Sequence, residues 1–447
     1  MRLSFKCYLF SSTVYLAILQ IVVYMTNYII AHKIPKAYAG DYFTTIAVLN
    51  FLANIFILGG GATLTKNLPL FRTKYTSSFL ANLINLSRFF FRAFIIVLVI
   101  SIILDSVFYI IHMHHFLLWD QNFYHPAELS LFGVFIIICT NYVSTYLSIE
   151  EYVDVMFYCS TLGLFFQMGL FLLNYYIDFK INFSYDQSAN LVLNYILFTL
   201  SGYGVALLLM AAYVFTRVVI NIPKNSRDQQ ELYHGWRKEL KYYILNALQG
   251  DWVIVSTIIL EIFSANETDP AVFSYLFGII GIICIVSKIS KQYYQSYLMN
   301  YFFKNDFISV KRFIINNLLI GGLVVGGISL ILIYYHDKVL NSFGVIKHFG
   351  LFFLLVICEF FNTLFKPALT GFLSFHSAKS LRDYTYLNTA SYLVLVVAGI
   401  AATLGFQLEG MLIVFVICTF SLTIFEILLF LSYFQNFKQE KELSPVS

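Results

Sequence analysis

Five polar residues of the apolar stretch 348 to 373 share one face of a predicted helix. They lie at positions i, i+3, i+4, i+7 and i+11: Glu359, Asn362, Thr363, Lys366 and Thr370. A charged side chain at the centre of a bilayer costs at least ~2.5 kcal/mol. We therefore expect this face to point into a helical bundle or a hydrated cavity, where a carboxylate can bind a proton or cation and an ammonium group can bind an anion.

Basic side chains outside this face form a second group of candidates. Lys288 and Lys291 continue a polar helix face toward the predicted inner side of the membrane, and Arg88 and Arg92 lie at the inner end of another apolar stretch. With Lys366, they could hold an anionic group that enters from the inner leaflet. They could also be anchors that reach the lipid headgroups, an alternative that weighs less for the deeper Lys288 and Lys366.

Amide side chains within apolar stretches could hydrogen-bond a polar ligand. The candidates are Gln20, Asn50, Asn54 and Asn362. The alternative is that they only join neighbouring helices, at about 0.6 kcal/mol per contact.

Acidic residues in the apolar stretches are candidates for coupling transport to an ion gradient. Glu359 has the depth of the bilayer midplane, Asp251 lies about ten residues into its predicted helix, and Glu426 lies in the inner half of the last one. Asp251 shares no helix face with the nearby amides, so Glu359 is the stronger candidate. A structural pair between Glu359 and a lysine of a neighbouring helix is an equally open alternative.

Long stretches without Asp, Glu, Lys or Arg position these residues. Each is long enough to cross a hydrocarbon layer of about 30 Å at about 1.5 Å per residue. The charge-free stretches are 7 to 32, 42 to 65, 129 to 149, 155 to 177, 187 to 216, 313 to 336 and 384 to 408. Further stretches that carry one to three charges are 86 to 111, 243 to 265, 270 to 296, 348 to 373 and 409 to 434. The sequence thus predicts an all-α polytopic membrane protein of about 12 transmembrane helices.

A polar segment near the midpoint divides the chain into two halves. The predicted organisation is a six-helix lobe over 1 to 220, a cytoplasmic linker over 221 to 241, a second six-helix lobe over 242 to 434 and a cytoplasmic tail over 435 to 447. Six spans on each side of a linker indicate two parallel repeats. Most of the 28 Lys and Arg residues then fall on one side, which predicts that both termini are cytoplasmic.

Composition and motifs exclude several other classes. The chain is 59% hydrophobic and 12% charged, which does not fit a soluble domain. Its six cysteines are scattered singly through the spans, and the cluster of His112, His114 and His115 at an outer span end is interpreted as an interfacial loop, so we expect neither disulfides, metal nor cofactor. No catalytic motif is present, and the net charge of +4 reflects membrane orientation rather than nucleic-acid binding.

Two segments carry a resemblance to a known family. Residues 39 to 69 read AGDYFTTIAVLNFLANIFILGGGATLTKNLP, and residues 269 to 298 read DPAVFSYLFGIIGIICIVSKISKQYYQSYL. The first resembles the N-terminal pattern of bacterial polysaccharide (O-antigen type) flippases, within the multidrug/oligosaccharidyl-lipid/polysaccharide exporter superfamily. The matching positions are Tyr38, Gly40, Tyr42, Gly59 to Gly61, Lys66, Leu68 and Pro69, with Gly40 displaced by one from the commonest spacing. The second segment is similar to the second repeat, with Ala271 and Phe273 where Gly and Tyr are usual.

This resemblance implies a transporter of the bacterial inner membrane with two lobes around a central cavity. Such a flippase moves undecaprenyl-pyrophosphate-linked oligosaccharide from the inner to the outer leaflet by alternating access, for lipopolysaccharide O-antigen or another surface polysaccharide. Its partners would be membrane lipids, a polysaccharide polymerase and other assembly proteins. For such a substrate the basic candidates would receive the pyrophosphate and the amides would contact sugar hydroxyls.

Two alternatives stay open. The first is a cation-coupled multidrug exporter of the same superfamily, which predicts an acidic cavity. The second is a membrane enzyme of polysaccharide assembly, either a polymerase or an O-acyltransferase, although a large outer loop and a His/Asp constellation at membrane level are not seen in the sequence.

Overall fold

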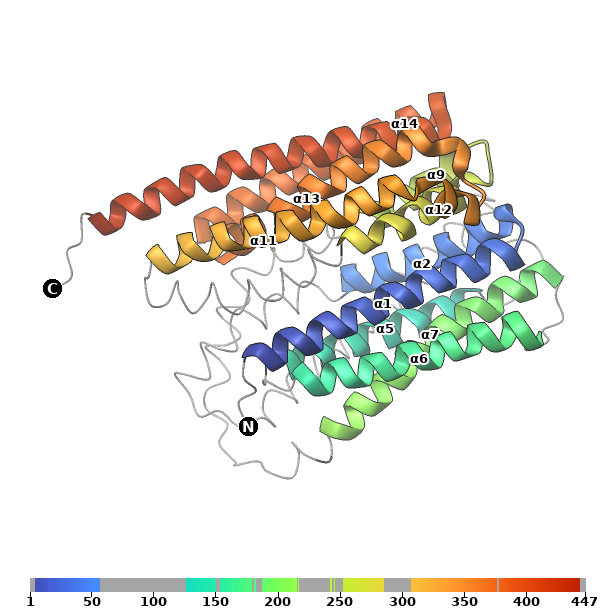
Figure 1. Cartoon of the computed structure of the whole chain (residues 1–447). Coiled ribbons are helices and arrows are strands. Elements are labelled where there is room, and N and C mark those ends of the chain that lie inside the picture. The colour runs from blue at the N-terminus through green and yellow to red at the C-terminus, as the bar shows by residue number, and fades with distance from the viewer. Residues whose placement is uncertain are drawn as a thin grey trace. The chain divides into compact units, whose positions relative to one another are not determined.

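The computed structural model describes most of the chain as long helices (Figure 1). The described residues are 5–56, 126–149, 153–178, 181, 187–214, 216, 242, 245, 252–284, 307–375 and 378–442. The predicted span 86 to 111, the linker 221 to 241 and the histidine cluster at 112 to 115 lie outside them.

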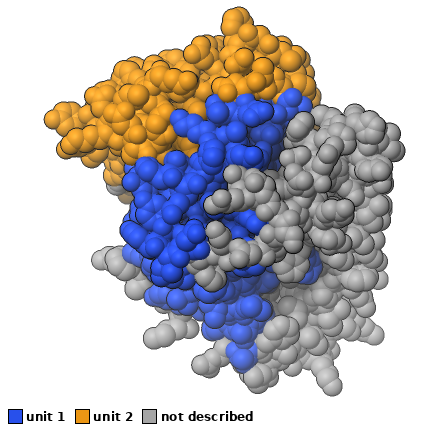
Figure 2. All heavy atoms as spheres, turned by 90° about the vertical axis from the view of Figure 1, so that its right-hand side faces the viewer, with its two compact units in different colours: residues 1–262, 267–271 blue, residues 263–266, 272–447 orange. Residues whose placement is uncertain are grey.

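The described residues form two compact units (Figure 2). The first comprises residues 1–262 and 267–271, and the second comprises residues 263–266 and 272–447. Helix α9, which the sequence places in the second lobe, thus groups largely with the first unit. The lobe boundaries drawn from the sequence stay a prediction.

The first unit is a bundle of long helices that pack against one another. Its described helices are α1 (Phe5–Lys33), α2 (Lys36–Phe56), α5 (Pro126–Ile149), α6 (Val153–Ile177), α7 (Gln187–Tyr213) and α9 (Trp252–Phe263). Helix α6 packs against α1 and α7, and α7 also packs against α2 and α5. The long elements lie side by side in Figure 1.

The second unit contains the remaining helices. They are the helix Asp269–Cys284, which begins at the unit boundary, α11 (Phe307–Tyr334), the short α12 (His336–Ser342), a 3₁₀ turn (Ile346–His348), α13 (Phe349–Phe375) and α14 (Ala378–Glu442). Helix α13 packs against both α11 and α14. Helix α14 continues well into the predicted tail, whose Lys, Gln and Glu residues are good helix formers.

These helices confirm the predicted fold class. Every predicted span except 86 to 111 coincides at least in part with a described helix, and the described residues contain no strand. By length and composition, 6 of the described helices could cross a membrane, with two shorter apolar helices beside them. The protein is therefore an all-α polytopic membrane protein.

A pair of glycines brings α6 and α7 into backbone contact. A side chain at Gly202 would place its Cβ 2.9 Å from the Cβ of Gln167 and 3.0 Å from the carbonyl oxygen of Gly163. A Cβ at Gly163 would meet the backbone of Gly202 in turn. In lipid, where helices associate through close packing rather than through the hydrophobic effect, such small residues determine where helices meet.

Helix α14 is a hairpin of two helices that meet at Gln407. The backbone of Gln407 has φ 53° and ψ −134°, and a Cβ at Gly410 would lie 2.8 Å from the carbonyl carbon of Ala402. The hydroxyl of Tyr433 donates to Asp383 at 2.6 Å, and these residues lie nearly equally far in sequence from Gln407. The two halves of α14 therefore run antiparallel, as the predicted spans 384 to 408 and 409 to 434 require.

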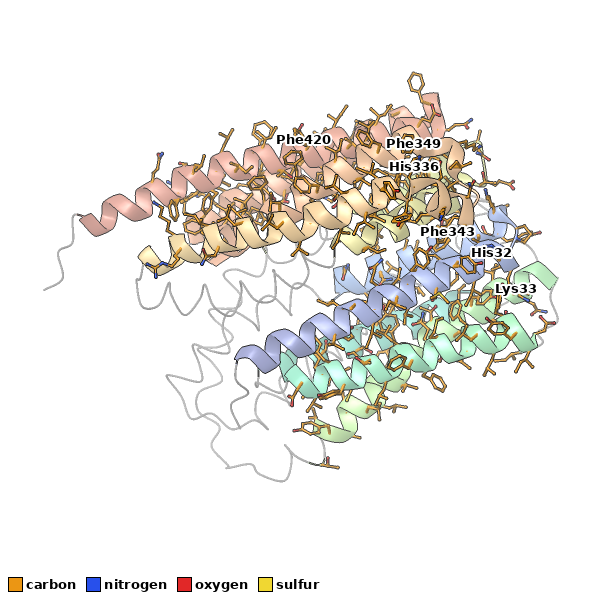
Figure 3. All side chains as sticks on the ribbon, in the orientation of Figure 1. His32, Lys33, His336, Phe343, Phe349 and Phe420 are labelled. Atoms are coloured by element: carbon orange, nitrogen blue, oxygen red, sulfur yellow. The ribbon has the colours of Figure 1, made fainter. Side chains whose placement is uncertain are left out.

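The connection that leads into α13 is also well defined. Helix α12 ends at Ser342 and is followed by Gly344 (φ 62°); the amides of Gly344 and Val345 donate to the carbonyls of Asn341 and Leu340, each at 3.0 Å. The rings of His336 and Phe349 then lie with their centroids 4.2 Å apart at the starts of α12 and α13 (Figure 3). This turn and ring contact set where α13, with its polar face, begins.

Candidate functional site: a buried charged cluster in the second unit

Glu359 is a buried carboxylate in the middle of α13. Its side chain is 5% exposed, and its Oε2 accepts a hydrogen bond from Nδ2 of Asn362 at 3.0 Å. The thiol of Cys284, on the helix Asp269–Cys284, donates to the same oxygen at 3.5 Å. Glu359 and Asn362 therefore lie on one face of the helix, and a second helix reaches that face.

Lys366 lies two helical turns from Glu359 on the same helix, half-buried. The next residue is Pro367, which has no amide hydrogen, so the carbonyl of Thr363 lacks the donor that an α-helix normally supplies four residues on. The hydroxyl of Thr363 is also buried without a hydrogen-bond partner among the described residues. The helix thus presents an ammonium group beside oxygens that can still accept hydrogen bonds.

Glu426 adds a second carboxylate from the second half of α14. Its side chain is 0% exposed, and the charge of Lys366 acts on it from α13. The side chains of Asn388 and Tyr384, from the first half of α14, lie beside it. Both side chains stabilise the ionised carboxylate, although among the described residues neither makes a hydrogen bond of good geometry to its oxygens. The cluster therefore joins two buried acids and one lysine across α13 and the α14 hairpin.

Only some of the residues predicted from the sequence belong to this cluster. Glu359, Asn362 and Lys366 lie on α13 within it. Lys288, Lys291, Arg88, Arg92 and Asp251 lie outside the described residues. Their roles stay predictions.

The amides predicted in the first half lie in the first unit. Gln20 is buried on α1, and Asn50 and Asn54 are half-buried on α2. The amide of Asn50 donates to the carbonyl of Ile46 on its own helix at 2.8 Å. A ligand-binding role for these amides stays a prediction.

The sequence did not single out Tyr384 and Asn388 beside Glu426. Their spacing of four residues within the predicted span 384 to 408 places both on one helix face, which was an available signal. Their nearness to Glu426 depends on the hairpin at Gln407, which the spacing does not reveal. Helix α9 also holds an acid that the sequence did not single out: Glu261 accepts a hydrogen bond from Thr44 at 3.0 Å.

Two positions of the family pattern on α2 have a structural reason. A Cβ at Gly40 would lie 3.1 Å from the carbonyl oxygen of Glu267, so a larger residue would displace the segment after α9. The hydroxyl of Tyr42 is hydrogen-bonded to that of Thr199 on α7 at 2.9 Å, and both side chains are buried. Glycine and tyrosine at these positions therefore support packing within the first unit.

Comparison with solved structures identifies the fold. The chain is similar to an outward-facing multidrug resistance MATE family transporter of the MOP superfamily (TM-score 0.63, 15% identity, 97% of this chain and 96% of that one). It is similar to an inward-facing structure of such a transporter (TM-score 0.60, 14% identity, 94% of this chain and 96% of that one). It also resembles a MOP superfamily transporter from Pyrococcus furiosus for which a binding pocket of reverse polarity suggests a different function (0.59, 15%, 98% and 97%).

The chain thus has the fold of MATE family transporters of the MOP superfamily over nearly its whole length. No protein-family model matches the sequence, and the comparison with curated proteins gives no match.

Proposed function

We propose that this chain is a cation-coupled membrane transporter that works by alternating access. The observation that carries the proposal is the pair of buried carboxylates, Glu359 on α13 and Glu426 on α14, with Lys366 of α13 acting on Glu426. Ionisable groups inside a membrane are costly to bury and typically mark ion or substrate pathways. A carboxylate that gains and loses a proton or cation can change the interactions of α13 as the ion gradient drives the cycle.

For the substrate, the structural neighbours favour a multidrug exporter over a flippase. They are described as multidrug resistance transporters. The described cluster holds two acids for one lysine, and an acidic site suits a cationic substrate. The membrane-enzyme alternative gains no support from these neighbours.

A flippase for undecaprenyl-pyrophosphate-linked glycan is the second candidate. It is supported by the pattern around Gly40 and Tyr42 and by the deep lysines Lys288 and Lys366, which suit an anionic headgroup. The reverse pocket polarity described for the Pyrococcus furiosus transporter is a precedent for another substrate on this fold. In either case we place the chain in the bacterial inner membrane with both termini cytoplasmic.

Transport by the purified chain in liposomes tests the coupling. Uptake of ethidium, an organic cation, should follow an imposed proton or sodium gradient in the wild type. We expect Glu359→Gln to lose the dependence on the gradient. Glu409→Gln, which changes an exposed glutamate of the same unit, should retain it. Unchanged gradient dependence in Glu359→Gln would remove Glu359 from the coupling site.

A cellular assay separates the two substrates. If the chain is a flippase, deleting its gene leaves lipid-linked oligosaccharide on the inner leaflet, and Lys366→Ala fails to restore surface polysaccharide although the protein inserts normally. If it is a multidrug exporter, the deletion raises the retention of ethidium and leaves surface polysaccharide unchanged.

A further inference from the structure

Glu426 is fully buried, yet no hydrogen bond of good geometry from the described residues compensates its carboxylate. Taking an ionised carboxylate out of water costs several kcal/mol unless ion pairing and hydrogen bonds compensate it. Lys366, Asn388 and Tyr384 all favour the ionised form, but no hydrogen bond of good geometry reaches either carboxylate oxygen from the described residues. Asn388 and Tyr384 lie beside Glu426 without a hydrogen bond of good geometry to its oxygens, whereas Asn362 donates to Glu359 at 3.0 Å. Glu426 is therefore able to accept a proton.

Other buried oxygens continue from Glu426 toward Glu359. The hydroxyl of Thr419 lies two turns before Glu426 on α14, and that of Thr363 lies one turn after Glu359 on α13. Both are buried and neither makes a hydrogen bond of good geometry among the described residues, although the Thr419 hydroxyl lies against the Cys358 thiol. Cys358 lies close to Thr419, and the charges of Glu359 and Lys366 both act on its thiol. The face of α13 that carries Cys358 therefore packs against the face of α14 that carries Thr419.

Buried polar groups that the protein leaves unsatisfied are typically satisfied by internal water. The hydroxyls of Thr363 and Thr419, with the carbonyl that Pro367 releases, therefore define a polar track between the two acids. The charged and titratable groups that face Glu426 along it are Lys366 from α13 and Tyr384 from the first half of α14.

We propose that Glu426 is a second proton-binding site, which exchanges a proton with Glu359 along this track. In the transfer an O–H bond breaks at the protonated Glu359 carboxyl, water held by the threonine hydroxyls carries the proton, and an O–H bond forms at the Glu426 carboxylate. Lys366 is a positioning residue, because its positive charge stabilises Glu426 while that carboxylate is ionised. The proposal rests on the coupling role of Glu359 and adds a second site to which its proton passes.

Infrared difference spectroscopy of the purified full chain tests this directly, since a protonated carboxyl has a carbonyl band that a carboxylate lacks. A pH titration of the wild type should show a band from a water-excluded acid, and Glu426→Gln should lose that band. Glu409→Gln removes an exposed carboxyl and should keep it. If Glu426→Gln keeps every buried-acid band of the wild type, Glu426 is a permanently ionised partner of Lys366 and the proposal is wrong.

Two further variants cover the case in which Glu426→Gln does not fold. Lys366→Met should move the band to a higher pH, because a neutral side chain no longer favours the ionised carboxylate. The double variant Thr363→Val/Thr419→Val should keep the band but slow gradient-driven transport, since the track loses its hydroxyls. An unmoved band in Lys366→Met, or unaltered transport in the double variant, would contradict the proposal.

The spectroscopic result separates this proposal from the proposed function. Lost gradient dependence in Glu359→Gln together with an unchanged band in Glu426→Gln would leave the transporter in place and remove only the second site. A band that Glu426→Gln abolishes in a chain that transports no tested compound would support the second site and contradict the proposed function.

Discussion

Replacing Lys366 by methionine isolates the charge that faces Glu426. Methionine has a similar length and no charge, so the change leaves a carboxylate that is 0% exposed without its counter-charge. Removing one partner of a buried pair costs about 3–5 kcal/mol. Lys366 is half-buried and makes no hydrogen bond to Glu426, so water screens part of its field and we expect a smaller loss, about 1–2 kcal/mol.

A second substitution shows whether this loss comes from Glu426. In Lys366→Met/Glu426→Gln neither charge remains, and the amide is cheaper to bury than an unpaired carboxylate. The double variant should therefore be more stable than Lys366→Met alone, with an interaction energy of about 1 kcal/mol. The measurement is unfolding of the detergent-solubilised protein, followed by circular dichroism. Lys366→Arg, which keeps the charge, is the control.

Additive losses would refute this reasoning. If the double variant loses the sum of the two single losses, the charges of Lys366 and Glu426 do not act on each other. A wild-type stability for Lys366→Met would lead to the same conclusion, since a desolvated acid could not then depend on this lysine.

Three other changes have definite expected results. Gly202→Leu should lower the stability of the protein by about 1–3 kcal/mol because α6 and α7 must separate, whereas Gly204→Leu on the same helix should not, since nothing lies within 4 Å of a Cβ there. Asn194→Leu should lower the unfolding temperature and expose the α6–α7 connection to protease, because the Asn194 amide bonds both the N–H and the C=O of Ile181, at 2.8 and 3.0 Å. Lys288→Ala should reduce transport although the protein still inserts normally into the membrane. A wild-type transport rate in this variant would mean that Lys288 only anchors its helix at the lipid headgroups.

The helical framework follows from the sequence because lipid leaves few choices. A backbone in the hydrocarbon layer must satisfy its own hydrogen bonds, so a long charge-free stretch must be a helix. The stretch 155 to 177 predicts α6 (Val153–Ile177), and the stretch 313 to 336 predicts most of α11 (Phe307–Tyr334). Helix ends differ more, because good helix formers carry α14 past the apolar region to Glu442.

The site is predictable only where its partners are local. The spacing of three residues between Glu359 and Asn362 places them on one face, and the structure joins them by a hydrogen bond. The neighbours of Glu426 come from two other helical segments, and no spacing rule connects them. Their meeting depends on a glutamine at positive φ, a conformation that usually favours glycine, so residue type gives no warning of the turn.

The turn at Gln407 makes α14 a fixed reference for distance measurements within the protein. A single residue joins its two helices at one end, and the Tyr433–Asp383 hydrogen bond links them at the other. The hairpin should therefore move as one rigid body. Spin labels on its two halves would keep a constant distance through every transport state. Any change measured from a label on α14 to another helix can then be assigned to motion of that other helix relative to the hairpin.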